Sequence, residues 1–312
     1  MRNIPKNKIP LLVIGGPTAS GKTAVGVRAA QLLGGEIVSA DSMQVYKGFP
    51  IATAKPTPEE KGGVPHHLLD IIERDRQFSV AEYAALAHAA IKDIHSRGRL
   101  PILVGGTGLY IKAVVENLRF CEQDTQEYHR LREQYQQIAR EQGSHVLHDM
   151  LGERDPQQAA AIDSANLGRM IRALAVYEMT GRTAAQNIEW SRGVPTPYHT
   201  LYTVLRYSDR GTLYGRINRR VDNMAENGLV QEAREALGSP SGTFSQAIGH
   251  KELAPYFAGK CTPEQALDRL KQQTRRYAKR QITWFSAVPG AAFIEADGKT
   301  ANEMAEEIVA LF

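Results

Sequence analysis

The stretch IGGPTASGKTAVG, from Ile14 to Gly26, decides the fold of this 312-residue chain. Residues 16–23 fit the pattern G-x-x-x-x-G-K-[ST] of a phosphate-binding loop, where backbone amides, a helix start and a lysine converge on phosphate oxygens. The apolar residues 10–15 predict a buried strand before the loop, and residues 22–33 a helix after it. The stretch therefore predicts a bound phosphate or diphosphate with Mg²⁺, which the Thr23 hydroxyl would help to hold. It does not specify hydrolysis.

Apolar runs and helical patterns alternate on both sides of the loop. They predict strands within residues 35–41, 100–108, 200–208 and 291–297, and a serine-capped helix within 78–98. Such alternation is typical of α/β proteins. We expect a P-loop NTPase-like parallel sheet with helices on both faces.

The composition of the sequence changes after residue 120. Residues 121–199 are rich in polar helical segments, one of which ends at Gly181, a typical helix stop. We therefore expect a small all-helical insertion domain at 121–199 in an α/β core formed by residues 1–120 and 200–312.

The composition argues against a membrane-spanning protein and against a metal site built on cysteines. The chain is 42% hydrophobic and 23% charged, and its longest apolar run is too short to span a bilayer. Its two cysteines, Cys121 and Cys261, match no metal-ligand spacing, which indicates a reduced, cytoplasmic protein. The net charge is only +4, but residues 269–281 are strongly basic and contain no acid, as in many nucleic-acid-binding segments. Nothing indicates an oligomer, so we expect a monomer.

The position of the candidate carboxylate residue argues against an ordinary ATPase. A P-loop ATPase has a second apolar strand that ends in a Mg²⁺-holding aspartate, whereas the strand ILVGGTG ends in glycines and Thr107. The candidate carboxylate is Asp41, which directly follows another apolar run. A residue in this position is predicted to lie at the carboxyl end of the sheet. There it could hold Mg²⁺ or act as a base, and a solvated turn remains the alternative. Ser42, Gln44 and Tyr46 form a hydrogen-bonding set that could read the edge of a base.

Taken together, these residues resemble the tRNA dimethylallyltransferase (tRNA isopentenyltransferase) family over nearly the whole chain. The matching segments are GPTASGKT (16–23), DSMQVYKG (41–48), IATAKPTPEE (51–60), VPHHLLD (64–70), PILVGGTGLY (101–110), RALAVYEMTG (172–181), LYGRINRRVDNM (213–224), QAIGHKE (246–252) and TRRYAKRQITWF (274–285). The first segment alone is common to many enzymes, but the combination in this order is highly specific.

The resemblance implies transfer of a dimethylallyl group from dimethylallyl diphosphate to N6 of the adenosine just 3′ of the anticodon. Asp41 would take the N6 proton, Thr107 would lie near the reacting atoms, and Arg216 would close on the diphosphate. The diphosphate and its Mg²⁺ would be held by the loop residues Gly16, Pro17, Thr18, Ala19, Ser20, Gly21, Lys22 and Thr23.

The resemblance also implies that the helical insertion grips a tRNA anticodon stem-loop. The implied RNA-contacting residues are Asp41, Ser42, Met43, Gln44, Gly168, Arg169, Met170, Ile171, Arg172, Gln246, Ala247, Ile248, Gly249, His250, Lys251, Arg275, Arg276, Lys279 and Arg280. Lys271 joins the last four in a basic stripe at helical spacing, for which a solvated cationic face is the alternative.

Two positions depart from the family pattern: Ala175 stands where glutamate is usual, and His250 where tyrosine is usual. Both could alter how tRNA docks. Two other functions also remain open from the residues alone. A P-loop phosphotransferase or ATPase would leave the basic segment unexplained, and a noncatalytic RNA-binding protein would leave Lys22, Thr23 and Asp41 without a role.

Overall fold

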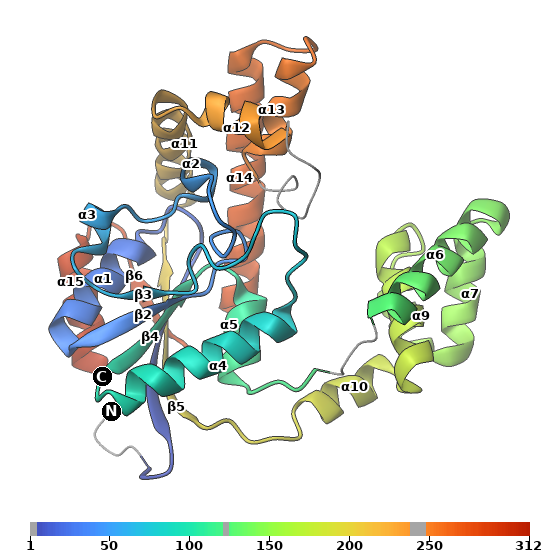
Figure 1. The fold of residues 1–312 in the computed structure, drawn as a ribbon, viewed down its shortest axis with the longest axis horizontal. Coiled ribbons are helices and arrows are strands. Elements are labelled where there is room, and N and C mark those ends of the chain that lie inside the picture. Colours follow the sequence, from blue (N-terminus) through green and yellow to red (C-terminus); the bar gives the residue numbers. More distant parts are fainter. Residues whose placement is uncertain (1–4, 121–124, 238–247) are drawn as a thin grey trace. The chain divides into compact units, whose positions relative to one another are not determined.

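The computed structural model describes residues 5–120, 125–237 and 248–312. The chain divides into an α/β unit, residues 1–115 with 197–312, and a helical unit, residues 116–196. Figure 1 labels the helices and strands of both units. The boundaries differ by a few residues from those expected, because the strand that re-enters the sheet already begins at Tyr198.

One parallel sheet organises the described part of the α/β unit. Its strand order is β3-β2-β4-β1-β5-β6, and every neighbouring pair is parallel. The strands are β1 (Ile9–Gly15), β2 (Gly35–Ser39), β3 (His66–His67), β4 (Leu100–Gly105), β5 (Tyr198–Arg206) and β6 (Ala292–Glu295). The predicted α/β fold is confirmed, and so are the helix over 22–33 and each of the predicted strands.

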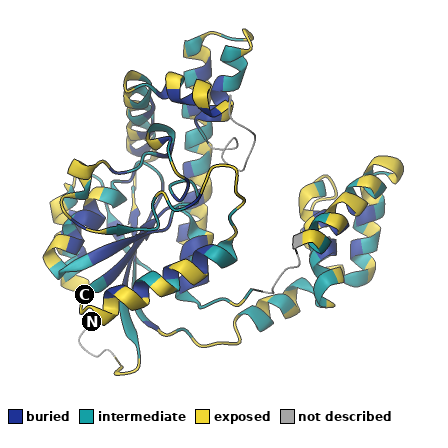
Figure 2. Cartoon of the chain, in the orientation of Figure 1, coloured by how far each residue is buried: buried dark blue, intermediate teal, exposed yellow. Residues whose placement is uncertain are grey.

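Alternate residues of the strands serve two apolar layers. Leu12 and Ile14 belong to the layer with α1 (Lys22–Leu33) and α15 (Ala301–Leu311). Leu11 and Val13 belong to the layer with α4 (Val80–Ser96) and α5 (Gly108–Val115). Because successive side chains of a strand point to opposite faces, continuous apolar runs indicate a sheet covered on both sides. Figure 2 shows these strands as buried, with exposed residues on the outer helix faces.

A second group of helices packs at the loop end of the α/β unit. It comprises α11 (Arg210–Glu226), α12 (Leu229–Leu237), α13 (His250–Phe257) and α14 (Pro263–Ser286). Their shared core contains Val221, Leu229, Leu253 and Leu270. Nearer the start of α11, Leu213 and Ile217 pack with Ala278 of α14 in a separate cluster, against which Ala19 of the loop also lies. The phosphate-binding loop is therefore supported by α11 and α14.

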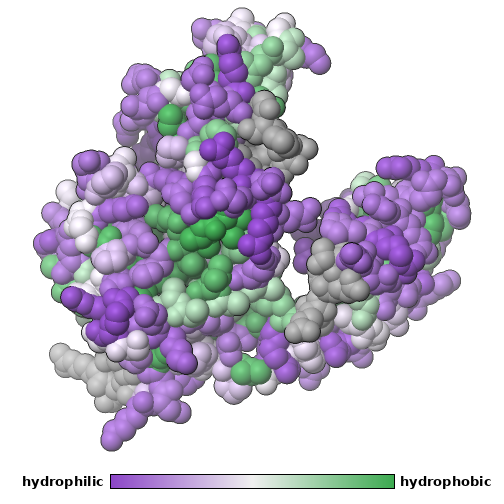
Figure 3. Space-filling view, in the orientation of Figure 1, coloured by the Kyte–Doolittle hydropathy of each residue, from purple (hydrophilic) through white to green (hydrophobic). Residues whose placement is uncertain are grey.

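The helical unit has its own core. It contains α6 (Thr125–Gln142), α7 (Ser144–Arg154), α8 (Pro156–Ala161), α9 (Leu167–Thr180) and α10 (Ala184–Ser191). Its buried residues include Leu147 and Leu174, and Gly181 ends α9 in a left-handed conformation, as predicted. The face of this unit visible in Figure 3 is mostly hydrophilic, as expected from the polar sequence of α6.

Three short elements were not predicted from the sequence: α2 (Pro50–Thr53), α3 (Pro58–Lys61) and the edge strand β3. His67 of β3 contacts the buried Glu36 through Nε2 (2.8 Å from Oε2), so this histidine has a structural role. No helix within the described ranges is long and apolar enough to cross a membrane.

Candidate active site

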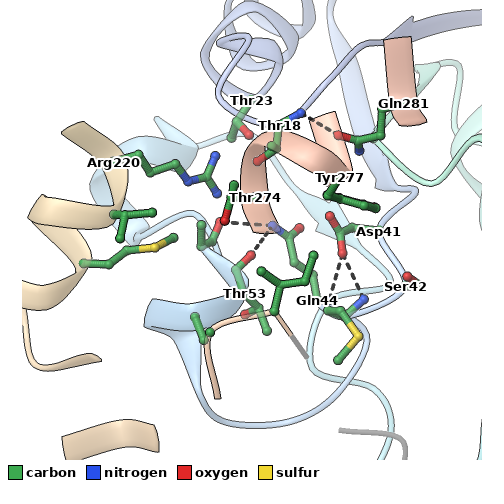
Figure 4. A pocket seen from close by; sticks show the side chains of 18 of the residues that line it. Thr18, Thr23, Asp41, Ser42, Gln44, Thr53, Arg220, Thr274, Tyr277 and Gln281 are labelled. Carbon is green, nitrogen blue, oxygen red and sulfur yellow. Dashed lines mark hydrogen bonds between the residues drawn. The ribbon is translucent and has the colours of Figure 1, made fainter. Parts of the chain in front are cut away.

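Three adjacent strands deliver the candidate residues to one edge of the sheet. In the order β2-β4-β1, Asp41 follows β2, Thr107 follows β4, and the phosphate-binding loop follows β1. The carboxyl ends of parallel strands meet at such an edge. Lys22 and Asp41 line the same cavity of about 350 Å³, which we call the inner pocket (Figure 4).

The backbone of the loop needs its glycines. Gly16 and Gly21 have φ angles of 152° and 90°. A Cβ on Gly16 would also lie 3.1 Å from the Leu205 carbonyl oxygen. Ala19 has a positive φ of 61°, which costs a non-glycine residue about 1 kcal/mol. The chain is thus held in a fixed shape directly before α1, and the start of a helix after such a loop is a common anion site.

The electrostatics of the inner pocket favour a bound anion. Burial, followed by the positive charge of Arg220, lowers the pKa of Lys22 from 10.5 to about 8, while Asp41 opposes the shift. Burial also lowers the pKa of Arg220. Lys22 donates to the Pro17 carbonyl oxygen at 3.2 Å. Two crowded cations near a helix start are stabilised when a phosphate group binds between them.

A second cavity, of about 750 Å³, adjoins the inner pocket; we call it the outer pocket. It shares Lys22, Thr23 and Arg220 with the inner pocket. Arg216 and Arg219 of α11 also line it, and Arg216 donates from Nε to the Ala19 carbonyl oxygen at 2.9 Å. The structure therefore places Arg216 against the loop, and its predicted contact with the diphosphate stays a prediction.

Arg220 is a residue that sequence reasoning missed. In Figure 4 its guanidinium extends from α11 toward Thr23 and Thr274. A signal was available, because Arg216 and Arg220 are four residues apart in LYGRINRRVDNM and so share one face of a helix.

One oxygen of Asp41 is fixed by the backbone. Its Oδ1 accepts from the amides of Met43 (2.9 Å) and Gln44 (3.3 Å). Among the described residues, no hydrogen bond to Oδ2 occurs. Asp41 also lies next to Tyr277, whose pKa is raised by burial and then by the Asp41 charge, so this phenol stays protonated (Figure 4). The carboxylate is oriented at one oxygen and can accept a proton at the other.

Thr107 connects the β4 turn to the Asp41 loop. Its Oγ1 accepts from the Ser42 amide at 3.0 Å and lies 3.3 Å from the Ser42 hydroxyl. The Thr107 amide in turn donates to the Ala40 carbonyl oxygen at 3.0 Å. Thr107 thus holds the residues on both sides of Asp41.

Several predicted RNA contacts need correction. Gln44 lines the inner pocket, but its side-chain Nε2 donates to the carbonyl oxygens of Thr53 and Ala54, so this NH₂ group tethers α2 and is not free to read a base. Tyr46 is 1% exposed and belongs to the core. His250 is 0% exposed, because it packs edge-on against Phe49 with Nε2 near Glu232 Oε1 (3.3 Å). From this position the His250 side chain cannot touch RNA.

The neighbours of His250 fall into two groups. Ile248, Gly249 and Lys251 line the inner pocket. Gln246 and Ala247 lie outside the described residues.

Ser42 and Met43, from the loop after β2, line the inner pocket as well.

The basic segment of α14 is not one uniform stripe. Lys271 pairs with Asp222 of α11 (2.6 Å), and Arg275 donates to Asn218 Oδ1 (2.6 Å). Arg276, Lys279 and Arg280 are exposed. Arg275 therefore fixes α14 against α11. Of the five cations in the predicted stripe, the three exposed ones are available to a phosphate backbone.

A mostly uncharged face of α14 turns into the inner pocket, with Arg280 as the one cation of this helix that lines it. Thr274, Tyr277 and Gln281, spaced three and four residues apart, line it. The cations dominate the pattern of TRRYAKRQITWF, so the polar residues interleaved with them were not predicted to line the site.

In the helical unit, the segment GRMIR is also divided. Gly168, Arg169 and Arg172 are exposed, whereas Met170 (0%) and Ile171 (3%) are buried in the core. The predicted RNA contact of these two side chains is therefore wrong, since helical periodicity directs them inward. Ala175 is buried beside them, so its departure from the family pattern concerns packing.

The residues present fit a magnesium ion only in company with a phosphate. No group of three His, Cys, Asp or Glu side chains that could hold a metal occurs in the parts of the chain that the structure describes. Thr23 lines both pockets at the start of α1, as expected of a hydroxyl that shares Mg²⁺ with phosphate oxygens and water. The donor set is therefore suited to a diphosphate–Mg²⁺ complex and not to a free ion.

Comparisons with known proteins agree on one family. The profile of the IPP transferase family matches residues 44–287. A tRNA dimethylallyltransferase from Geobacillus thermodenitrificans is 49% identical over 279 residues, which cover 88% of this chain and 87% of that protein.

Two solved structures are similar over most of the chain. A tRNA isopentenylpyrophosphate transferase from Bacillus halodurans has a TM-score of 0.71 at 43% identity, covering 97% of this chain and 96% of its own. A eukaryotic dimethylallyltransferase acting on tRNA has a TM-score of 0.79 at 29% identity, covering 93% of this chain and 75% of its own.

Proposed function

This chain belongs to the IPP transferase family, and we propose that it transfers a dimethylallyl group from dimethylallyl diphosphate to N6 of the adenosine immediately 3′ of the anticodon in tRNA. One observation carries the proposal beyond family membership. The loop with Lys22 and the carboxylate of Asp41 line one pocket, so an anionic leaving group and a proton acceptor can act on the same substrate pair.

In this reaction the loop holds a leaving group. The bond between the allyl carbon and the diphosphate oxygen breaks, and negative charge develops on the departing diphosphate. Lys22, the amides at the start of α1, and the guanidinium groups of Arg216 and Arg220 stabilise this charge. Preorganised donors of this kind supply the largest catalytic contribution in many enzymes. Magnesium held through Thr23 would neutralise further phosphate charge when bound.

Asp41 receives the proton. As the bond between N6 and the allyl carbon forms, the amine becomes acidic, and its proton passes to Asp41 Oδ2. The two amide bonds to Oδ1 keep the carboxylate in place while this happens. Thr107 contributes by holding Ser42, the residue next to Asp41. A positioned general base contributes roughly 10²–10⁴-fold to the rate.

The adenosine reaches the inner pocket only if it leaves the stack of the anticodon loop. Base flipping of this kind costs a few kcal/mol and suits single-stranded loops. Exposed cations would hold the RNA backbone: Arg276, Lys279 and Arg280 of α14, and Arg169 and Arg172 of the helical unit.

Incubation with dimethylallyl diphosphate labelled in the allyl group, Mg²⁺ and an unmodified tRNA tests the proposal. We expect label in the adenosine 3′ of the anticodon, and none when guanosine replaces that adenosine. A folded protein that is stabilised thermally by ATP, gains nothing from the allylic diphosphate and labels no RNA would contradict the proposal and favour a phosphotransferase.

A further inference from the structure

The side chain of Gln281 joins two loops that come from different strands. The amide of Thr18, in the phosphate-binding loop after β1, donates to Gln281 Oε1 at 2.8 Å. Gln281 Nε2 donates to the carbonyl oxygen of Gly106, after β4, at 2.9 Å. Gln281 is 6% exposed, and Figure 4 shows its contact with Thr18 at the rim of the inner pocket. Both ends of one side-chain amide are thus used to connect the loops.

The turn after β4 packs closely against the side chains of α14 around Gln281. A Cβ on Gly106 would lie 2.4 Å from Gln281 Nε2. One turn farther along, a Cβ on Gly108 would lie 2.1 Å from Trp284 Nε1. Neither glycine has a positive φ, so close approach of α14 is what requires them. The helix is locked against the turn that follows β4.

This turn leads directly to the proposed base. Gly106 precedes Thr107, which accepts from the amide of Ser42, the residue after Asp41. A continuous path of hydrogen bonds and peptide units therefore runs from Thr18 through Gln281 to Asp41. One end of the path holds the diphosphate, and the other holds the acceptor of the N6 proton.

We propose that Gln281 is a positioning residue that fixes the separation between the diphosphate-holding loop and the Asp41 loop. The inference rests on the function proposed above. Gln281 makes and breaks no covalent bond in the reaction. It keeps the allyl carbon and N6 within the approach distance of about 3–3.5 Å from which they react, and a displacement of about 1 Å can lower a rate about 10²-fold.

Substitution by methionine separates positioning from simple packing. Gln281→Met keeps a similar length but removes both hydrogen bonds. We expect the rate of the chemical step to fall about 10–100-fold, with KM for both substrates changed by less than about threefold. Gln272→Met is the matched control, because Gln272 is an exposed glutamine of the same helix, and its rate should equal that of the wild type.

Substitution by glutamate adds a readout that packing alone would not change. A neutral carboxylic acid can accept from Thr18 and donate its O–H to Gly106, as the glutamine does. The carboxylate can still accept from Thr18, but it faces the Gly106 carbonyl oxygen with no proton to donate. The rate of Gln281→Glu relative to the wild type should therefore rise as the pH is lowered from about 8 to about 6, because burial raises the pKa of such a carboxyl. The relative rate of Gln281→Met should stay flat.

The experiment measures single-turnover transfer by the wild type and the three variants at several pH values, with the thermal midpoint of each. A Gln281→Met rate within about twofold of the wild type, or a raised KM at an unchanged rate, would overturn the proposal. A flat pH profile of the relative rate of Gln281→Glu would also overturn the proposal. If the methionine variant does not fold, this pH profile is sufficient as the test. An inactive wild type would instead refute the proposed function and this inference with it.

Discussion

Replacing Asp41 by asparagine is the sharpest test of the proposed chemistry. Asparagine retains an oxygen where Oδ1 accepts from Met43 and Gln44, so the loop should keep its shape. At the Oδ2 position it places an NH₂ group, which cannot take the N6 proton. We expect the rate of the chemical step to fall roughly 10²–10⁴-fold, equivalent to about 2.7–5.4 kcal/mol of lost transition-state stabilisation.

The structural contribution of Asp41 can be measured separately with alanine. Asp41→Ala loses both amide bonds, and each hydrogen bond to a charged group contributes about 1.5–3 kcal/mol, with the longer one of 3.3 Å at or below the lower end. Denaturant unfolding should thus show Asp41→Ala destabilised by about 2–4.5 kcal/mol and Asp41→Asn by less than about 1 kcal/mol.

The assay is single-turnover transfer to an anticodon stem-loop at saturating dimethylallyl diphosphate. Calorimetric titration with inorganic diphosphate and Mg²⁺ serves as the binding control, and its affinity should be unchanged in Asp41→Asn. If Asp41→Asn transferred the allyl group within about tenfold of the wild-type rate, the role of Asp41 as the base would be refuted.

Three further predictions concern charge. Because burial holds the pKa of Lys22 at about 8, the affinity of the free enzyme for diphosphate should fall up to about tenfold per unit above pH 8. Titration of Lys22→Gln should lack this additional loss. Hydrogen bonds from Arg97 hold the pKa of Glu36 at about 2, below its usual 4.5, so this stabilisation is complete above pH 4.5 and is lost toward pH 2. Glu36→Gln should cost about 1.5–3 kcal/mol at pH 7 in denaturant unfolding, and a difference that persists at pH 2 would contradict this origin. Lys279→Ala should weaken tRNA binding and reduce the salt dependence of log K by about 0.7–1, whereas an unchanged slope would exclude a phosphate contact.

The sheet and the phosphate-binding loop could be predicted because their signals are local. Continuous apolar runs such as residues 10–15 indicate strands covered on both faces, and the spacing of Gly16, Gly21 and Lys22 fixes the loop that follows. The short elements α2 and β3 could not be predicted in this way. Their stability comes from distant partners, such as Glu232, which accepts from the amides of Ile51 and Ala52.

The site was predictable for residues next to strand ends and less so for residues on helices. Asp41 and Thr107 follow apolar runs, so their convergence follows from strand order. On α14, sequence alone could not separate the inward face, with Tyr277 and Gln281, from the exposed Lys279, because tertiary packing decides which side of a polar helix is buried. His250 illustrates the same difficulty, since a polar residue in a matching segment is fully buried.

The central claim is that the loop with Lys22 holds a diphosphate leaving group whose departure is joined to alkylation of RNA. The most direct measurement counts, in one reaction with wild-type protein, the diphosphate released and the dimethylallyl groups found on the target adenosine by mass spectrometry. We predict equal amounts of both, and neither product when RNA is left out. Diphosphate release without RNA alkylation, or phosphate release from ATP beside unmodified RNA, would contradict the claim.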